Sequence, residues 1–349
     1  MQVGDVNRFG RHQNAFGFLR LVFASLVILS HTPELIDGNR HREILTRLFG
    51  TLSFGELAVD GFFLISGYLI TGSYLKQAEI WSYLRKRIAR IYPAFIAASL
   101  ACIFVVAPLG GGRIDFETLR VAALRIVILQ GPDVPGAFAN SPYPFLNGAM
   151  WTIAYEFRCY LLVPALGLLG IYKRSWALVA LTAATILIDT LGSSNLLTEH
   201  SQYADLHNTL RLLYMFLVGT IFYVRRDSIK FTRPKLMLAA SLLFPCLFVD
   251  LLAEPALAVL GGYLLFAAAE SGGRTVLARM NNDDDISYGL YLYAWPIEKL
   301  LLWFAPSLNI AIVGLVTWIG AMALGALSWF SLEKPIMQAL RSPRSAVEV

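Results

Sequence analysis

The feature that most limits the fold of this chain is a series of long apolar runs that recurs from one end to the other. Crossing the hydrocarbon core of a bilayer takes about 20 predominantly apolar residues per helix. Runs of this kind cover residues 15–33, 57–75, 91–109, 149–171, 175–193, 209–225, 235–253, 255–271, 286–304 and 308–331. No polar low-complexity linker separates them, so we expect residues 1–349 to form a single integral-membrane domain. The predicted fold class is all-α: a polytopic transmembrane helical bundle of about ten spans.

The scarcity of charge supports a membrane protein. Only 15% of the residues are charged, against about 25% in an average soluble domain, and the mean hydropathy is +0.58. The net charge of +5 comes from cations in short loops that form no single basic face, so no nucleic-acid partner is expected. Cys102, Cys159 and Cys246 lie inside apolar runs without metal-like spacing, and no metal is expected.

Loop cations predict the orientation in the membrane, because Lys and Arg concentrate in cytoplasmic loops. With the N-terminus inside, inner segments hold 19 of the 29 Lys and Arg residues and outer loops hold 6, which predicts that both termini are cytoplasmic. The first run follows Arg8 and Arg11 but lacks a small-x-small cleavage site, so we expect it to remain as the first span. The segment 119–130 is too short and too charged to span, and is expected to lie against the bundle or the interface.

Arg20 and His31 lie at opposite ends of the first apolar run. Eleven residues separate them, close to three helical turns, so both side chains fall on nearly the same face, with a rise of roughly 16 Å between them. Ionisable groups inside a membrane need a partner or a function. The predicted orientation places His31 at the outer end, Asp60 of the second run near the same depth, and Glu156 in the outer half of the fourth run.

His31, Asp60 and Glu156 could form an acid–base set. A neutral imidazole can take the proton from a hydroxyl that attacks a carbonyl, and a carboxylate can fix its tautomer. The alternative is that His31 caps a helix end beside water and Asp60 is a lone interfacial carboxylate. The residues alone do not decide between these. Arg158 falls on nearly the opposite helix face from Glu156 and is not expected to be its direct partner.

A cationic cluster lies at the inner end of the third run. It consists of Arg87-x-x-Arg90 with Arg85 and Lys86. Positive-inside anchoring explains it most simply. The alternative is an anion clamp for a phosphorylated cytoplasmic ligand, since guanidinium groups match phosphate geometry. Pro93 is expected in the first turn of the membrane helix, which would leave both arginines of the motif before it and accessible.

Three further stretches have mainly structural interpretations. Ser66-Gly67 is a small pair that allows close helix approach. Tyr288 and Tyr291 share one side of the ninth run, with Trp295 a turn beyond, and could line a groove for an acyl chain or a sugar, although packing explains them at least as well. The segment 199–207 holds histidines and acids without metal-specific spacing and is expected to be a solvated loop.

Taken together, these residues resemble the integral-membrane acyltransferase-3 family, which acylates hydroxyl groups of sugars and other small acceptors from acyl-CoA. The resemblance spans most of the chain, and its specificity comes from the order and depth of six motifs rather than from any one of them. The motifs are Arg20-x10-His31, the segment 59–67, Arg87-x-x-Arg90 with Tyr92-Pro93, the segment 151–156, the segment 287–291, and Glu333-Lys334-Pro335.

The resemblance implies that His31 is an essential base, that Glu156 matters, and that the arginines bind CoA on the inner side. We therefore predict a catalytic set, an acyl-CoA set and an acceptor set. They are His31, Asp60 and Glu156; Arg20, Arg85, Arg87, Arg90 and Ser66; and Trp151, Tyr155, Tyr288, Tyr291 and Arg211. Many relatives carry a His in the ninth-span motif where this chain has Ala294-Trp295, so no acid–base role is assigned to that helix. No hydrolase-like periplasmic domain is expected after the tenth span.

The predicted function is O-acyl transfer in the bacterial cytoplasmic membrane. Acyl-CoA, most simply acetyl-CoA, would donate to a hydroxyl of a carbohydrate such as an exopolysaccharide, a lipopolysaccharide or a lipid-linked glycan. The alternative is a transporter or flippase that uses the same charges as a proton relay, but the sequence shows no repeated halves with broken helices. A non-catalytic receptor has nothing specific in its favour. The acceptor, the acyl chain and the oligomeric state stay open.

Overall fold

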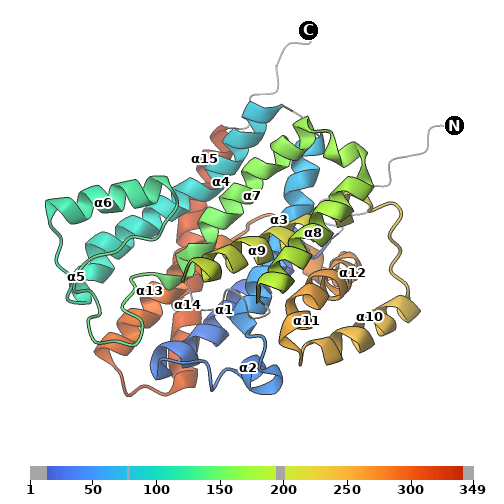
Figure 1. The fold of residues 1–349 in the computed structure, drawn as a ribbon. Helices are drawn as coiled ribbons and strands as arrows, with labels where there is room; N and C mark the ends of the chain where they lie inside the picture. The colour runs from blue at the N-terminus through green and yellow to red at the C-terminus, as the bar shows by residue number, and fades with distance from the viewer. Residues whose placement is uncertain (1–13, 77–78, 194–200, 341–349) are drawn as a thin grey trace, which may run out of the picture. The chain divides into compact units, whose positions relative to one another are not determined.

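Every regular element of the structure is a helix. The computed structural model describes residues 14–76, 79–193 and 201–340, and these form helices, turns and loops without a strand (Figure 1). The all-α prediction is therefore confirmed. Within this part of the chain, six stretches are long and apolar enough to cross a membrane: Phe16–Asp37, Phe54–Lys76, Ile80–Leu109, Ser175–Gly192, Asp250–Gly272 and Ile310–Ala339. They indicate a multi-pass membrane protein, while ten spans and cytoplasmic termini stay predictions.

The contacts of the chain divide it into two compact units. Unit 1 comprises Met1–Ser30, Arg40–Lys76 and Arg158–Asp283, and unit 2 comprises His31–Asn39, Gln77–Phe157 and Asp284–Val349. Two helices, α1 (Phe16–Asp37) and α7 (Trp151–Leu168), contribute residues to both units. The prediction of a single membrane domain is not tested by this division.

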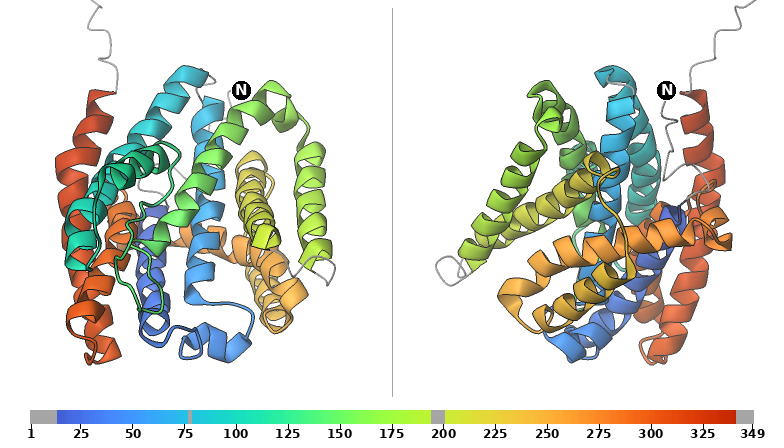
Figure 2. Two further views of the ribbon diagram at one scale, coloured as in Figure 1. Left: turned by 60° about the vertical axis from the view of Figure 1, so that its left-hand side comes forward. Right: turned by 90° about the vertical axis from the view of Figure 1, so that its right-hand side faces the viewer.

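Unit 1 is organised around α3 (Phe54–Lys76), which packs along α9 (Ser201–Val224). Helix α8 (Ser175–Ser193) lies beside α9 and forms a helical hairpin with it (Figure 2). The other elements of this unit are α2 (Ile44–Phe49), η3 (Ile171–Lys173), α10 (Arg233–Cys246), α11 (Asp250–Ala256), η4 (Leu257–Gly261), α12 (Gly262–Gly272) and η5 (Val276–Arg279).

Glycines bring the backbones of α3 and α9 into direct contact. A Cβ atom at Gly67 would lie 2.0 Å from the carbonyl oxygen of Phe216, and one at Gly219 would lie 2.0 Å from the carbonyl oxygen of Leu64. Small residues permit this approach, which in a membrane replaces the hydrophobic effect as a source of helix association. The prediction that the Ser66-Gly67 pair allows close helix approach is confirmed at Gly67.

Unit 2 is organised around α13 (Ser287–Phe304), which packs along α14 (Ile310–Ser328). Its other elements are α4 (Ile80–Ala101), η1 (Cys102–Val106), α5 (Ala107–Leu109), α6 (Phe116–Val127), η2 (Gly148–Met150), η6 (Trp329–Glu333) and α15 (Lys334–Ala339). Gly289 and Gly325 let α13 and α14 touch, since a Cβ atom at Gly289 would lie 2.5 Å from the Cα atom of Gly325.

Helix α1 continues past Pro33 to Asp37, so the predicted end of the first run at residue 33 was wrong. A proline inside a helix removes one backbone hydrogen bond, and packing of the following turn can offset this loss. Glu34 and Leu35, which follow the proline, are both buried. The consequence is that Glu34 lies on the same helix as His31.

Helix α4 begins at Ile80, well before the predicted start of the third run at residue 91. The carboxylate of Glu79 caps this helix by accepting two backbone N–H hydrogen bonds. Pro93 therefore lies inside the helix, and its predicted place in the first turn was wrong. Arg87 and Arg90 consequently lie on α4 itself rather than before it.

The predicted boundary between the runs 235–253 and 255–271, beside Pro255, was also wrong. Helix α10 is only 14 residues long, and the chain then forms one continuous helical stretch, Asp250–Gly272, that runs through Pro255. The π-helical turn η4 follows directly, and such turns absorb an irregularity without ending a helix. At 14 residues α10 is shorter than a perpendicular span requires.

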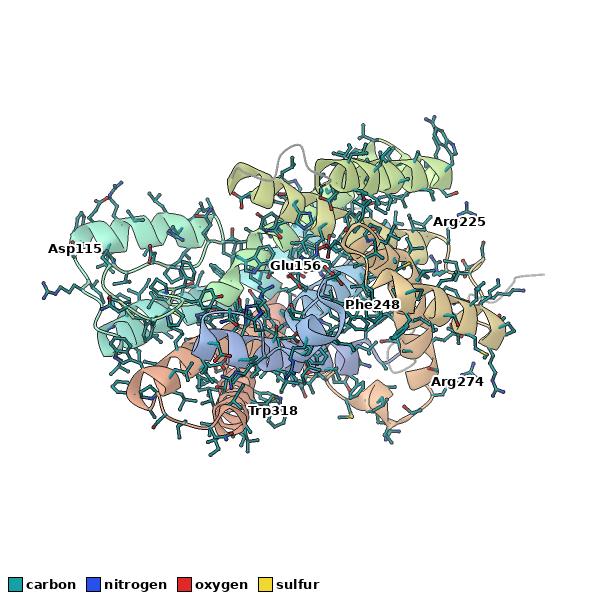
Figure 3. The ribbon with its side chains drawn as sticks, turned by 60° about the horizontal axis from the view of Figure 1, so that its bottom comes forward. Asp115, Glu156, Arg225, Phe248, Arg274 and Trp318 are labelled. Atoms are coloured by element: carbon teal, nitrogen blue, oxygen red, sulfur yellow. The ribbon has the colours of Figure 1, made fainter. Side chains whose placement is uncertain are left out.

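Two shorter segments were predicted with mixed success. Helix α6, which covers most of the segment 119–130, is too short to span, and the Asp115 carboxylate caps it by accepting from the backbone N–H of Thr118 at 2.7 Å (Figure 3). Its place at an interface stays a prediction. The solvated loop predicted for 199–207 was wrong from residue 201 onward, because α9 begins there, and residues 199–200 lie outside the described residues.

Candidate functional site

His31 lies on α1, in unit 2, and two side chains hold its ring. Its Nδ1 lies 2.9 Å from Oε2 of Glu34, one turn later on the same helix. Trp295 on α13 meets the imidazole edge-to-face, with ring centroids 4.9 Å apart. A carboxylate can only accept a hydrogen bond, so Nδ1 carries the proton, and in the neutral imidazole Nε2 then presents a lone pair. The His31 side chain is 19% exposed, which leaves part of the ring accessible from outside the protein.

Trp295 is itself held in place by the segment before α7. Its indole Nε1 donates a hydrogen bond to the carbonyl oxygen of Phe145 at 3.3 Å. Gly148 makes room for the ring, because a Cβ atom there would lie 2.5 Å from the indole. Asn147 joins the same segment to α13 by donating to the carbonyl oxygen of Leu292 at 2.7 Å. These contacts restrict the movement of the ring that packs against His31.

Glu298 is a second carboxyl group near this histidine. It follows Trp295 by three residues on α13 and is 1% exposed. The Thr32 hydroxyl and the Glu34 carboxylate lie beside it, and within the described residues neither of its carboxylate oxygens has a well-formed hydrogen bond. A buried carboxyl group without a full set of partners is costly, and such groups concentrate at functional sites.

Asp60 belongs to unit 1, where it pairs with Arg211. Its Oδ1 accepts from Nε and from the terminal NH2 nitrogen of Arg211 at 3.0 and 2.8 Å, and both side chains are almost fully buried. In the described part of the chain Oδ2 of Asp60 is buried without a hydrogen-bond partner. Arg211 also lies 3.5 Å from Oε1 of Glu254. The ion pair joins α3 to α9.

The network continues to His207, which lies between two carboxylates. Its Nδ1 is 2.9 Å from Oδ1 of Asp189 and its Nε2 is 3.5 Å from Oε1 of Glu254. These three residues offer ligand atoms within 4.8 Å of one another and could hold a metal ion. However, Arg211 already lies against Glu254, so a metal ion would face a neighbouring guanidinium. We interpret the group as an ion-pair network.

Arg90 has two carboxylates and two aromatic rings around its guanidinium group. Its two terminal nitrogens lie 2.8 Å from Glu333 and 2.6 Å from Asp285. The guanidinium carbon lies 5.5 Å from the centroid of the Tyr288 ring and 5.3 Å from that of Trp329. Arg90 therefore joins α4 to η6 and to the start of α13. Its predicted contact with CoA is not tested by this arrangement.

The other cations of the cluster are more accessible. Arg85 and Lys86 are exposed on α4, and Arg87 is half-buried with its guanidinium 5.9 Å from the centroid of the Tyr83 ring. Three positive charges therefore lie within one helical turn on the first half of α4.

Both tyrosines of the ninth predicted span are packed. The Tyr288 hydroxyl donates to the carbonyl oxygen of Ile91 at 3.1 Å. The Tyr291 hydroxyl lies 2.8 Å from Thr152 Oγ1 and also donates to the carbonyl oxygen of Ala149. Both residues are at least nine-tenths buried. Of the two explanations left open by the sequence, packing is the one with visible contacts, and a role in acceptor binding stays a prediction.

The remaining predicted residues line three different helices. Trp151 on α7 is 40% exposed, and its ring lies 5.6 Å from that of Tyr155. Glu156 follows on α7 and is half-buried (Figure 3). Arg20 on α1 and Ser66 on α3 are half-buried in unit 1. Their predicted roles stay predictions.

Most of the predicted site falls in unit 2. The members there are His31, Arg85, Arg87, Arg90, Trp151, Tyr155, Glu156, Tyr288 and Tyr291, whereas Arg20, Asp60, Ser66 and Arg211 belong to unit 1. Sequence reasoning missed Glu34 and Glu298. The signal for Glu34 was its i, i+3 spacing from His31, which was lost because the helix was ended at Pro33.

Comparison with known proteins points to one family. The model of a family described as "Acyltransferase domain" matches residues 13–334. The chain is 26% identical to an "O-acetyl transferase" of Shigella phage Sf6, over 92% of this chain and 95% of that protein. It is 28% identical to "Nodulation protein 10" of Rhizobium leguminosarum bv. viciae, over 94% of each chain. It is 25% identical to "Acyltransferase MdmB" of Streptomyces mycarofaciens, over 42% of this chain and 38% of that protein. No solved structure matches.

Proposed function

This chain belongs to the acyltransferase-3 family and is a membrane O-acyltransferase, and on that premise we propose that it moves a short acyl group from cytoplasmic acyl-CoA to a hydroxyl of a carbohydrate. Acetyl-CoA is the proposed donor, and the name of the phage relative, an O-acetyl transferase, supports an acetyl group. The proposed acceptor is an exopolysaccharide, a lipopolysaccharide or a lipid-linked glycan. No metal is part of the proposal.

The observation that carries the proposal is the His31–Glu34 pair. Glu34 accepts a hydrogen bond from Nδ1–H, so Nε2 is available to take a proton from an acceptor hydroxyl. In the proposed step the hydroxyl oxygen forms the ester bond to the thioester carbonyl carbon, and the carbon–sulfur bond breaks. The imidazolium of His31 then returns the proton to the CoA thiolate. Glu34 stabilises that imidazolium, and Trp295 keeps the ring oriented.

The donor is proposed to bind at the first half of α4. Arg85, Lys86 and Arg87 offer three cations for the CoA phosphates, and two of them are exposed. Arg90 is retained as a proposed donor contact, and it is also proposed to position α4 through its two carboxylate partners. Arg20, which precedes His31 by eleven residues on α1, and Ser66 are retained as proposed donor contacts.

The proposed setting is the bacterial cytoplasmic membrane, crossed about ten times with both termini in the cytoplasm. The excess of Lys and Arg in alternate loops supports this orientation. It places the N-terminal half of α1 on the cytoplasmic side and His31 toward the outer side. Donor and acceptor would therefore approach from opposite faces of the membrane.

Acyl transfer in proteoliposomes tests the proposal. Purified protein is supplied with labelled acetyl-CoA and a panel of oligosaccharides, and ester formation is followed by mass spectrometry. Wild type is expected to acetylate at least one oligosaccharide, and His31→Ala is expected to lower the rate by at least about 100-fold, the usual contribution of a general base. His41→Ala, at an exposed histidine, is the matched control and should retain activity. Full activity in His31→Ala would remove His31 as the base.

A further inference from the structure

A cavity lies in unit 2 where the end of α1, the segment 138–142 and the last turns of α13 meet. Its volume is about 480 Å³, within the range of roughly 300 to 1,000 Å³ that is typical of small-molecule sites. Its lining includes Leu35 and Ile36 of α1, Ser141, and Lys299 and Trp303 of α13. None of these residues belongs to the predicted catalytic, donor or acceptor sets.

Lys299 gives this cavity an unbalanced positive charge. The residue is 4% exposed. Its Nζ donates to Ser141 Oγ at 2.7 Å and to the carbonyl oxygen of Tyr143 at 2.6 Å, and it lies 4.9 Å from the centroid of the Phe138 ring. Among the described residues no carboxylate lies within ion-pair distance of this nitrogen. An ammonium group has three N–H donors, so one is left for a further partner.

A buried cation without a counter-charge is costly, whereas a buried cation paired with an anion can be tolerated. Among the described residues, every contact of Nζ is to a neutral oxygen or an aromatic ring, and these solvate the charge without neutralising it. An anionic ligand in the cavity would supply the missing charge. Trp303 offers an aromatic face for a sugar ring in the same cavity.

The cavity lies about one helical turn from His31 along two separate helices. Leu35 follows His31 by four residues on α1, and Lys299 follows Trp295 by four residues on α13, which is a rise of roughly 6 Å in each case. His31 and Trp295 are in ring contact, so both helices lead from that contact to the cavity. In the proposed orientation both helices run outward, toward the side from which the acceptor arrives.

We propose that this cavity binds the acceptor through an anionic group, so that the enzyme selects acidic carbohydrates and Lys299 is the specificity-determining residue. The anion is a carboxylate, as in a uronic acid, or a phosphate on the sugar. The inference rests on the proposed carbohydrate acceptor and specifies that this acceptor carries a negative charge. Lys299 binds the anion, and His31, one turn away, takes the proton from a hydroxyl of the same acceptor.

Two measurements on the full-length protein in proteoliposomes test this. The first compares acetylation of an oligoglucuronate, a matched oligoglucose and glucose 1-phosphate. For wild type, the KM for at least one acidic acceptor is expected to be about 10- to 100-fold lower than for oligoglucose, as a charge-assisted hydrogen bond provides. Lys299→Met should remove this preference while the KM for acetyl-CoA and the kcat stay within a few-fold, and Lys299→Arg should restore part of it.

A control variant separates the effect of the Lys299 charge from the effect of packing in the segment 138–142. Ser141→Ala removes one contact of Lys299 but keeps its charge, and should retain the preference for the acidic acceptor. A wild type that acetylates neutral and acidic acceptors with equal KM would overturn the proposal. So would a loss of preference in Ser141→Ala equal to that in Lys299→Met. The better of the two acidic acceptors identifies the anion as carboxylate or phosphate.

The second measurement is binding without acetyl-CoA, which keeps this proposal distinct from the proposed reaction. Quenching of tryptophan fluorescence by the three sugars gives their dissociation constants for wild type and for Lys299→Met. Tighter binding of an acidic sugar that is lost in Lys299→Met supports the cavity even if no ester forms with any carbohydrate. Equal dissociation constants for acidic and neutral sugars in wild type would overturn it even if the acetyl transfer itself is observed.

Discussion

The two units differ in whether their buried ionisable side chains are paired. In unit 1, Asp60 pairs with Arg211, which contacts Glu254, and His207 lies between Glu254 and Asp189. Every cation in this network faces an acid. In unit 2, by contrast, Lys299 has no carboxylate partner in the described part of the chain, and Glu298 has no well-formed hydrogen bond there.

The difference separates two uses of buried charge. Paired charges satisfy one another and join helices, as Asp60 and Arg211 join α3 to α9. Arg90 shows that unit 2 can do the same, since two carboxylates surround it. A buried charge without a partner does not stabilise the fold. Such a charge is retained where a ligand or a reacting group pairs with it. We therefore expect substitutions in the unit 1 network to change stability, those around His31 to change the rate of acyl transfer, and those at Lys299 to change acceptor binding.

The largest effect is expected at the Asp60–Arg211 pair. Asp60→Asn leaves the Arg211 charge buried without its main partner, which costs about 3–5 kcal/mol when a buried pair is broken. The free energy of unfolding in detergent, measured by titration with a denaturant, should fall by this amount.

A double variant sharpens this test. Arg211→Gln combined with Asp60→Asn removes both charges, and should recover a large part of the lost stability. If Asp60→Asn instead abolished acyl transfer while leaving the free energy of unfolding unchanged, Asp60 would have the catalytic role predicted from the sequence, and the contrast between the two units would fail.

A smaller effect in free energy is expected at Glu34. Glu34→Gln keeps the size of the side chain but removes the carboxylate that holds the Nδ1 proton of His31, so kcat should fall by about 100-fold, or about 2.7 kcal/mol in activation free energy. The rate of acetyl transfer at saturating substrate measures it. Glu117→Gln, at an exposed carboxylate on α6, is the control and should leave kcat unchanged. A normal kcat in Glu34→Gln would show that Glu34 does not orient His31.

The smallest effect is expected at Asp284, in the segment before α13. Hydrogen bonds from Lys334 and Trp329 lower the pKa of this carboxyl from its usual value. A lowered folded-state pKa means that the carboxylate stabilises the fold at neutral pH, and that this contribution is lost as pH falls through the lowered value. Since the side chain is 41% exposed, Asp284→Asn should cost less than about 1 kcal/mol.

The pH dependence provides the check on Asp284. The difference in free energy of unfolding between wild type and Asp284→Asn should be present at pH 7. It should begin to shrink below about pH 4, where the carboxylate of the unfolded chain becomes protonated, and be lost as pH falls through the lowered folded-state pKa. A difference that stays constant down to pH 3 would mean that the charge of Asp284 has no part in it.

Several elements could be predicted from the sequence because their signals are local. Long apolar runs require helices in a membrane, since no other open structure satisfies the backbone there, and the run at 175–193 became α8 with the same bounds. Gly67 was correctly interpreted as a place of close helix approach. His31 was singled out because an ionisable group at the end of an apolar run is costly.

Helix ends beside prolines were predicted less well. The runs were ended or started near Pro33, Pro93 and Pro255, and all three lie inside helices. A proline removes one backbone hydrogen bond, but burial of the surrounding turns can outweigh that loss, and burial is a tertiary property. The error at Pro33 had a consequence for the site. With the helix ended at residue 33, Glu34 was not recognised as a residue on the same helix as His31.

By itself, the sequence determined a helical membrane protein of the acyltransferase type, and it singled out His31 as a candidate for proton transfer. Only the tertiary structure decided which charges meet. Asp60 pairs with Arg211 across 151 residues of sequence, and Arg90 with Glu333 across 243. No local sequence pattern predicts pairs of residues so far apart in the chain, because these pairs depend on which helices pack together. The same packing leaves Lys299 beside a cavity with no carboxylate partner among the described residues, and only the folded arrangement of its neighbours reveals this.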